Sequence, residues 1–228
     1  MLHPAEIKVM LSAAFKEAYL ELVPQFERST GHKVTSLWVA SVQMMSRLKS
    51  GEGVDLVIVS AAAIDELIKA GIIADRVDLA RLGVGVAVRA GTPKPDISSG
   101  EALRRAVQAA RSIVYSTGPS GLYLARLFER MGIAEEIKAK VRQMQGEPAG
   151  GVVARGEAEI GFQQISELLP VPGIDLVGPL SADVQEITVF SAGVHVAAKA
   201  PNPARALVKF FTSPDAASVV RKKGLEPI

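Results

Sequence analysis

The sequence predicts an α/β protein made of two units, each built on a mixed, mainly parallel β-sheet flanked by helices. Short apolar runs alternate with helix-like patterns up to about residue 75, which is typical of a parallel sheet with helical crossovers. The run Val54–Val59 is apolar enough to be buried on both faces. Two longer apolar stretches break the alternation, and we interpret them as strands that cross between the units. The boundaries that follow are residues 1–84 with 190–228 for the first unit and 85–189 for an inserted second unit.

The first unit opens with a strand at Ile7–Leu11 and a helix that starts at Ser12. Apolar residues recur at helical spacing along that helix, and Gly31 is placed to end it. Pro24 predicts a kink or break near Val23, since proline removes a helical hydrogen bond. The elements expected next are a strand at Lys33–Trp38, a helix over Ser41–Lys49, the strand Val54–Val59 and a helix ended by Gly71.

The second unit continues the same kind of pattern after a loop with two close prolines, Gly91–Asp96. The elements expected there are a helix through Leu103–Ala110, a strand at Ile113–Tyr115, a helix opening at Ser120 and running to Met131, a strand at Glu159–Phe162 and an apolar segment at Ile174–Val177. Two helices, after Pro203 and Pro214, return to the first unit.

Composition excludes several classes of protein. Lys and Arg total 26 against 24 Asp and Glu, and they form no basic stripe, so we expect no nucleic-acid partner. No apolar run approaches the ~20 residues of a membrane span, so we expect no membrane insertion. The absence of cysteine excludes disulfides and thiolate metal sites. The start of the sequence has no signal-peptide pattern. The expected location is therefore cytoplasmic if Met1 is the native start, and periplasmic if a signal peptide was removed.

Small neutral residues follow the expected strands, at the edge where open parallel sheets bind ligands. Helix N-termini at that edge offer unpaired N–H groups and a partial positive charge. Each serine taken singly is explained as a helix cap, but several on one edge suit an anion held by neutral donors. These residues are Ser12, Ala13 and Ser41 in the first unit, and Ser120, Gly121 and Gln164 in the second.

Four phrases of the sequence carry a family resemblance, in order and with similar spacing. They are Phe26–Val34, Gly51–Ile58, Pro119–Ala125 and Gly156–Gly161. They resemble phrases of the molybdate-binding components of ABC importers and, more widely, of the type II periplasmic binding proteins. The resemblance implies a two-lobed fold that closes by hinge motion on a small anion, with an ABC permease as partner. We expect a monomer with no cofactor and no bound metal.

The same resemblance assigns roles to the predicted residues. It implies that Ser12 and Ser41, with Ala13 beside the first, bind the ligand from one lobe. It also implies that Ser120, followed by Gly121, offers a backbone donor from the other. The family's tyrosine falls on Gln164, whose amide both donates and accepts hydrogen bonds. The ligand is therefore expected to be an oxyanion such as molybdate or tungstate, or a small carboxylate.

Two alternatives to simple binding remain open. One is an isomerase of a small organic acid, resembling aconitate isomerases, which needs a base within reach of its substrate. The candidates for that base are His195, Glu147, Glu167 and Tyr123. The other is a cytoplasmic anion-sensing domain, disfavoured because the first strand begins too early for a preceding helix-turn-helix module. Binding without catalysis is the favoured prediction.

The histidines, the tryptophan and two pairs of carboxylates are also candidate functional residues. The histidines His3, His32 and His195 lack metal-ligand spacing, so no metal site is predicted. Trp38 is equally consistent with a core position and with a wall of the ligand site. Two pairs of carboxylates are expected to be solvated charges at the starts of strands, opposite the ligand edge; they are Glu52 with Asp55 and Glu157 with Glu159.

Overall fold

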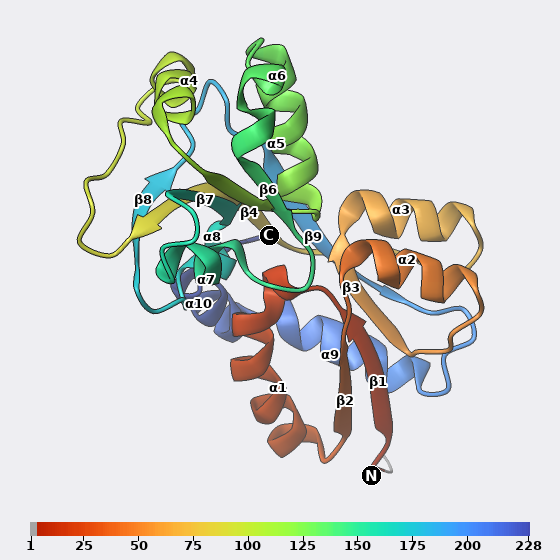
Figure 1. The fold of residues 1–228 in the computed structure, drawn as a ribbon. Helices are drawn as coiled ribbons and strands as arrows, with labels where there is room; N and C mark the ends of the chain where they lie inside the picture. The colour runs from red at the N-terminus through yellow and green to blue at the C-terminus, as the bar shows by residue number, and fades with distance from the viewer. Residues whose placement is uncertain (1–3) are drawn as a thin grey trace. The chain divides into compact units, whose positions relative to one another are not determined.

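The computed structural model describes residues 4–228, so His3 lies outside the described residues (Figure 1). The chain divides into two compact units. The first comprises the chain up to Arg81 together with Val189–Ile228, and the second is Leu82–Thr188. The chain passes from one unit to the other within β4 (Val77–Arg89) and within β9 (Ile187–Val194). The two predicted boundaries fall in these same strands.

The sheet of the first unit is mainly parallel. Strand β1 (Glu6–Leu11) pairs in parallel with β2 (Lys33–Trp38) on one side and with β3 (Leu56–Ser60) on the other. Strand β9 runs antiparallel beside β3, with Val194 opposite Leu56 and Phe190 opposite Ser60. All five residues of β3 are buried, as the apolar run predicted. The carboxyl ends of β1, β2 and β3 therefore meet at one edge of the sheet.

Helices follow each of these parallel strands. A short 3-10 turn, η1 (Ala13–Phe15), leads into α1 (Lys16–Thr30), and β2 leads into α2 (Ser41–Lys49). Of the kink or break expected near Val23, the break is wrong, because α1 is continuous through Pro24 and ends at Gly31 in the left-handed conformation. Aromatic packing spans the proline, since Tyr19 lies against Phe211 before it and Phe26 against Phe210 after it. The other elements here are α3 (Ala61–Lys69), α9 (Pro201–Phe211), α10 (Pro214–Lys222) and β10 (Glu226–Pro227).

The second unit has its own mixed sheet. Strand β5 (Ile113–Ser116) pairs in parallel with β6 (Val141–Met144) and with β7 (Ile160–Gln164). Strand β4 runs antiparallel to β7 and to β8 (Ile174–Pro179). The helices of this unit are α4 (Gly100–Ala109), α5 (Pro119–Arg130), α6 (Ala134–Ile137), η2 (Lys138–Lys140), α7 (Ala149–Ala154) and α8 (Ile165–Leu168).

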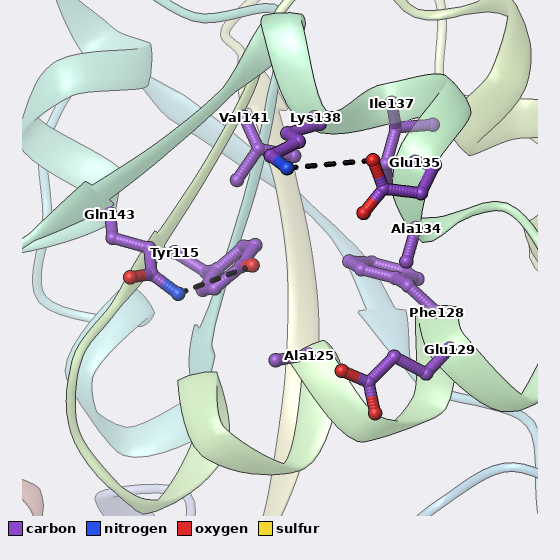
Figure 2. A pocket seen from close by; sticks show the side chains of 10 residues that line it. All are labelled: Tyr115, Ala125, Phe128, Glu129, Ala134, Glu135, Ile137, Lys138, Val141 and Gln143. Carbon is purple, nitrogen blue, oxygen red and sulfur yellow. Dashed lines mark hydrogen bonds and ion pairs between the residues drawn. The ribbon is translucent and has the colours of Figure 1, made fainter.

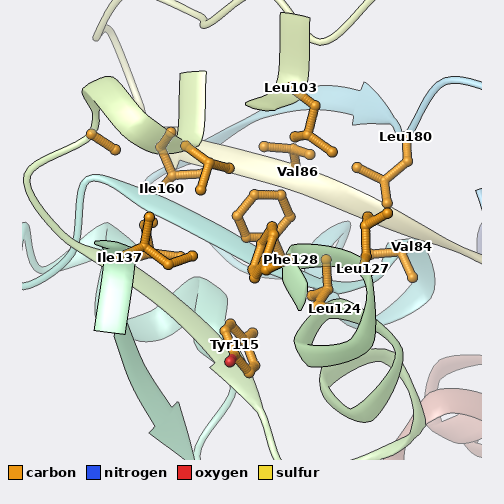
Figure 3. Close-up of a cluster of buried hydrophobic side chains, with 14 of the residues drawn as sticks. Val84, Val86, Leu103, Tyr115, Leu124, Leu127, Phe128, Ile137, Ile160 and Leu180 are labelled. Carbon is orange, nitrogen blue, oxygen red and sulfur yellow. The ribbon is translucent and has the colours of Figure 1, made fainter. Parts of the chain in front are cut away.

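Aromatic rings fill the centre of the second unit (Figure 3). The ring of Phe128, from α5, lies 6.0 Å from that of Phe162 in β7 and 6.1 Å from that of Tyr115 in β5. Leu103 and Val86 close the same cluster from α4 and β4. The core thus fixes α5 against the sheet, and with it the loop that precedes α5.

Asp55 corrects one expectation. It is buried, with 5% of its surface exposed, and it is not a solvated charge. Its carboxylate accepts hydrogen bonds from the backbone N–H groups of Lys8 and Ala200, each at 2.8 Å. These donors lie 47 and 145 residues away in the chain, so the sequence around Asp55 gives no sign of them. The other three carboxylates, Glu52, Glu157 and Glu159, do form ion pairs near the surface.

Nowhere in residues 4–228 is there a helix of the length and apolar character that crossing a membrane requires.

Candidate ligand-binding site

Ser12 follows the last residue of β1 and precedes η1. Its backbone N–H donates to the carbonyl of Ile58 at 3.1 Å, which fixes it between the ends of β1 and β3. Its side chain is buried, with 7% of the residue exposed, and caps no helix. Within residues 4–228 its Oγ has no hydrogen-bond partner. The explanation of Ser12 as a helix cap is therefore wrong, and a buried hydroxyl remains free to bind a ligand.

Ala13 and Ser41 open the helical segments beside this serine. Ala13 is exposed and begins η1. Ser41 is the first residue of α2, whose capping position is Ala40, and its hydroxyl does not cap the helix. Both serines therefore lie at the carboxyl edge of the parallel strands, next to unpaired N–H groups of helical first turns.

Ser120 and Gly121 occupy the first turn of α5, and Ser120 is buried. The first N–H groups of a helix have no partner within it, and Gly118 precedes them in an extended conformation. Gly121 has a structural reason to be glycine. A Cβ added there would lie 1.6 Å from the carbonyl oxygen of Ser116, so α5 contacts the backbone at the end of β5 directly. The glycine thus brings the helix close to the strand.

Gln164 ends β7 and is buried, with 1% of its surface exposed. Its Nε2 donates to Oγ1 of Thr188 at 3.1 Å. Its Oε1 has no hydrogen-bond partner within residues 4–228. A threonine hydroxyl both donates and accepts. Turning the amide by half a rotation therefore pairs Oε1 with Thr188 and leaves the two N–H groups of Nε2 free. In either orientation one polar end of Gln164 is buried without a protein partner.

Glu167, in α8, adds an acidic group close to the end of β7. It lies three residues after Gln164, and Nε2 of Gln163 donates to its Oε1 at 2.9 Å. The Oε1 of Gln163 in turn accepts from the backbone N–H of Ala149 at 2.8 Å, at the start of α7. Burial raises the pKa of the Glu167 carboxyl to about 7. This carboxyl is therefore held in place and exchanges its proton near neutral pH.

The other three candidate bases are occupied elsewhere. His195 follows β9 at the end that pairs with the start of β3, the edge opposite Ser12, and its Nδ1 accepts from the N–H of Ala197 at 3.0 Å. The hydroxyl of Tyr123 donates to the carbonyl of Val184, and burial raises its pKa. Glu147 forms an ion pair with Arg155 at 2.6 Å. Glu167 lies just beyond the carboxyl end of β7, and burial raises its pKa.

Lys16 brings a positive charge that the sequence prediction missed. It begins α1, four residues after Ser12. Its Nζ lies 5.7 Å from the centre of the Trp38 ring, at the carboxyl end of β2. The ring of Trp38 packs edge-on against Tyr19 and Trp38 is 40% exposed. Trp38 is therefore a surface residue at the carboxyl edge of the sheet and not a core residue. An exposed helical lysine is too common in sequences to be singled out by pattern.

Two cavities lie within single units, away from the predicted residues. One, of about 420 Å³, lies among α5, α6 and β5 to β6 in the second unit (Figure 2). Tyr115 and Phe128 form its walls, and two pairs of its polar residues bond, Gln143 with Tyr115 and Lys138 with Glu135, each at 3.4 Å. The other, of about 290 Å³, lies in the first unit beside β9 and α9. Neither is lined by any of the six predicted site residues.

Among residues 4–228, no three histidine or acidic side chains gather closely enough to hold an ion. His32 is buried, and its Nδ1 accepts from the N–H of Ala5 at 3.1 Å.

Comparison with known proteins agrees with this architecture. The family model described as bacterial extracellular solute-binding protein matches residues 7–226. An aconitate isomerase from Pseudomonas sp is 39% identical over 230 residues, covering 97% of this chain and 88% of that protein. The molybdate-binding protein ModA of Azotobacter vinelandii is 26% identical, covering 96% and 89%.

A solved structure gives the fold independently of sequence. The periplasmic molybdate-binding protein of Azotobacter vinelandii superposes with a TM-score of 0.79 at 19% identity, covering 96% of this chain and 98% of that one. The predicted mixed α/β class and the resemblance to molybdate-binding proteins are thereby confirmed. The chain therefore belongs to the bacterial extracellular solute-binding protein family and has the type II periplasmic-binding-protein fold.

Proposed function

We propose that the protein binds a small carboxylate anion through neutral donors at the carboxyl ends of parallel strands. The observation that carries this proposal is a pair of buried polar groups without protein partners, Ser12 Oγ in the first unit and the Gln164 amide in the second. An unpaired buried polar group costs stability. A ligand that accepts a hydrogen bond from such a group would remove its cost on binding.

A carboxylate is preferred over a tetrahedral metal oxyanion for two reasons. The relative named as an aconitate isomerase shares 39% of its residues with this chain, against 26% for the molybdate-binding relative. Gln164 also stands where the resemblance to molybdate binders places a tyrosine. A planar amide has two N–H groups and matches a planar carboxylate better than a single phenolic hydroxyl does.

Thermal unfolding with a panel of anions tests the proposal. The panel contains cis- and trans-aconitate, citrate and succinate against molybdate, tungstate, sulfate and phosphate. An anion at ~100 times its dissociation constant adds ~2.7 kcal/mol, which raises the melting temperature by several degrees in a chain of this size, at ~2–4 °C per kcal/mol. Stabilisation by carboxylates alone supports the proposal. Stabilisation by molybdate and tungstate alone overturns it in favour of oxyanion delivery to an ABC permease.

Isomerisation of the bound acid is a second candidate function, and Glu167 is the observation that favours it. Moving the double bond of an aconitate-like acid requires one proton to leave a carbon beside it and one to be returned at its other end. A carboxyl with a pKa of about 7 is partly ionised at neutral pH, so it both accepts and donates a proton. Glu167 also makes no ion pair with any described residue, so no fixed positive charge holds it ionised.

Proton NMR distinguishes binding from catalysis. Wild-type protein with trans-aconitate in D₂O is expected to form the cis isomer and to exchange the migrating proton for deuterium. Glu167→Gln keeps an acceptor for Gln163 and is expected to bind the acid without converting it. Binding without turnover by the wild type would reject isomerisation and leave the carboxylate proposal intact.

A further inference from the structure

Lys16 occupies a position that folding stability does not explain. It is the first residue of α1, and a helix N-terminus carries a partial positive charge that disfavours a cation. Within the described chain it has no acidic partner, although fifteen ion pairs are formed by other residues. Its Nζ atom lies 5.7 Å from the centre of the Trp38 ring.

The Trp38 ring is itself held in place. It packs edge-on against Tyr19 at 5.5 Å between ring centres, and the Tyr19 hydroxyl bonds Ser36 at 2.7 Å. Burial raises the pKa of Tyr19 to about 12, so that hydroxyl stays neutral. The result is an ordered aromatic surface that keeps a lysine ammonium close to the carboxyl edge of the first unit's sheet.

This charge lies next to the residues already placed at that edge. Trp38 is in register with Leu11, the residue before Ser12. Lys16 lies four residues after Ser12, directly after the 3-10 turn η1 that follows Ser12. The buried, unpaired Oγ of Ser12 is an independent sign that a ligand binds here. The neutral donors at Ser12 suit one carboxylate of a ligand. The ammonium of Lys16 suits a second carboxylate of the same ligand.

We propose that Lys16, supported by Trp38, determines specificity by binding a second carboxylate of a polycarboxylate ligand. The inference rests on the proposed carboxylate binding and adds the preferred class of ligand. Acids with two or three carboxylates are selected over monocarboxylates. Ser12 and its neighbours bind the first carboxylate, and Lys16 attracts and orients the second.

Titration calorimetry of Lys16→Gln with trans-aconitate tests the proposal. Loss of one charge-assisted hydrogen bond is expected to weaken binding about tenfold or more. Binding by the wild type is expected to weaken more steeply with added salt than binding by the variant. Lys33→Gln is the matched control, because Lys33 lies at the opposite end of β2 and is exposed. It should bind as the wild type does. Trp38→Phe keeps an aromatic surface and should lose less affinity than Lys16→Gln.

The outcomes separate this inference from the function on which it rests. If the wild type binds trans-aconitate and Lys16→Gln binds it equally well, the role of Lys16 is wrong and carboxylate binding stands. If Lys16→Gln and Lys33→Gln weaken binding equally, the effect is one of net charge and the proposal fails. If the wild type binds none of the carboxylates, both proposals fail together.

Discussion

The side chain of Gln163 joins Glu167 to the start of helix α7. Its Nε2 donates to the Glu167 carboxylate at 2.9 Å, while its Oε1 accepts from the N–H of Ala149 at 2.8 Å. Both ends of the Gln163 amide are hydrogen-bonded, which fixes its orientation. It therefore always presents an N–H donor to Glu167. Burial nevertheless outweighs this hydrogen bond and raises the pKa of Glu167.

Glu167 therefore makes stability depend on pH. Its pKa rises from 4.5 to about 7 on folding, so the folded chain binds this proton more tightly than the unfolded chain. The free energy of unfolding therefore falls as the pH rises from 4.5 to about 7, and above pH 7 the whole loss is present. Glu167→Gln should be more stable than the wild type by about 1–3 kcal/mol at pH 8. The gain should vanish by pH 4.5.

Urea unfolding at pH 5 and pH 8 measures this difference. Glu129→Gln serves as the control, because Glu129 is exposed and should give no gain at either pH. A Glu167→Gln variant whose advantage is the same at both values would contradict the raised pKa.

Ser12 and Ser99 should respond in opposite ways to alanine. Ser99 caps α4, its Oγ accepting from the N–H of Ala102 at 3.1 Å, so Ser99→Ala should cost ~1 kcal/mol of stability. Ser12→Ala removes a buried hydroxyl with no partner and should leave stability within ~0.5 kcal/mol. The effects on affinity should be the opposite. Ser12→Ala should bind trans-aconitate about tenfold more weakly, and Ser99→Ala should bind it as the wild type does. Thermal unfolding and calorimetry on the two variants check both halves, and a marked loss of stability in Ser12→Ala would indicate a structural role.

The strands that the sequence predicted best are those buried on both faces. Strand β3 is buried throughout, and its apolar run admits little other interpretation. Strand β6 was missed because it lies at the sheet edge and pairs only with β5. Its residues, Val141–Met144, are half-buried or exposed, so they show no apolar pattern. The continuous helix through Pro24 was missed because propensity cannot weigh the tertiary packing on either side of the proline.

In the candidate site too, residues marked by local sequence were predicted, and residues that depend on distant contacts were not. Gln164 was predicted because a strand end and a family phrase both mark its position. Lys16 was missed because its significance comes from a partner distant in the chain, the Trp38 ring. Pairing of this kind is a property of the folded chain and leaves no local pattern.

Gly121 should not tolerate a side chain. An added Cβ would lie 1.6 Å from the carbonyl oxygen of Ser116, a backbone atom that cannot move aside cheaply. Gly121→Ala should therefore cost about 3 kcal/mol or more, at the upper end of overpacking changes, or prevent folding. Gly118→Ala is the control, because its Cβ would lie 3.4 Å from the Ser116 hydroxyl at a backbone conformation open to any residue. Soluble yield and urea unfolding separate the two, and equal stability would mean that α5 is not packed this closely on β5.

Asp55 should be intolerant of losing one acceptor oxygen. Its Oδ2 accepts from the N–H of Lys8 and its Oδ1 from that of Ala200, at the start of α9. Asparagine has a single acceptor oxygen, so Asp55→Asn leaves one buried N–H facing an NH₂ group and should cost about 1–3 kcal/mol. Asp65→Asn, at an exposed carboxylate paired with Arg76 at 2.7 Å, should cost under about 1 kcal/mol. Urea unfolding at neutral pH compares them. Equal losses would mean that Asp55 acts as a surface charge, as its place at the start of a strand first suggested.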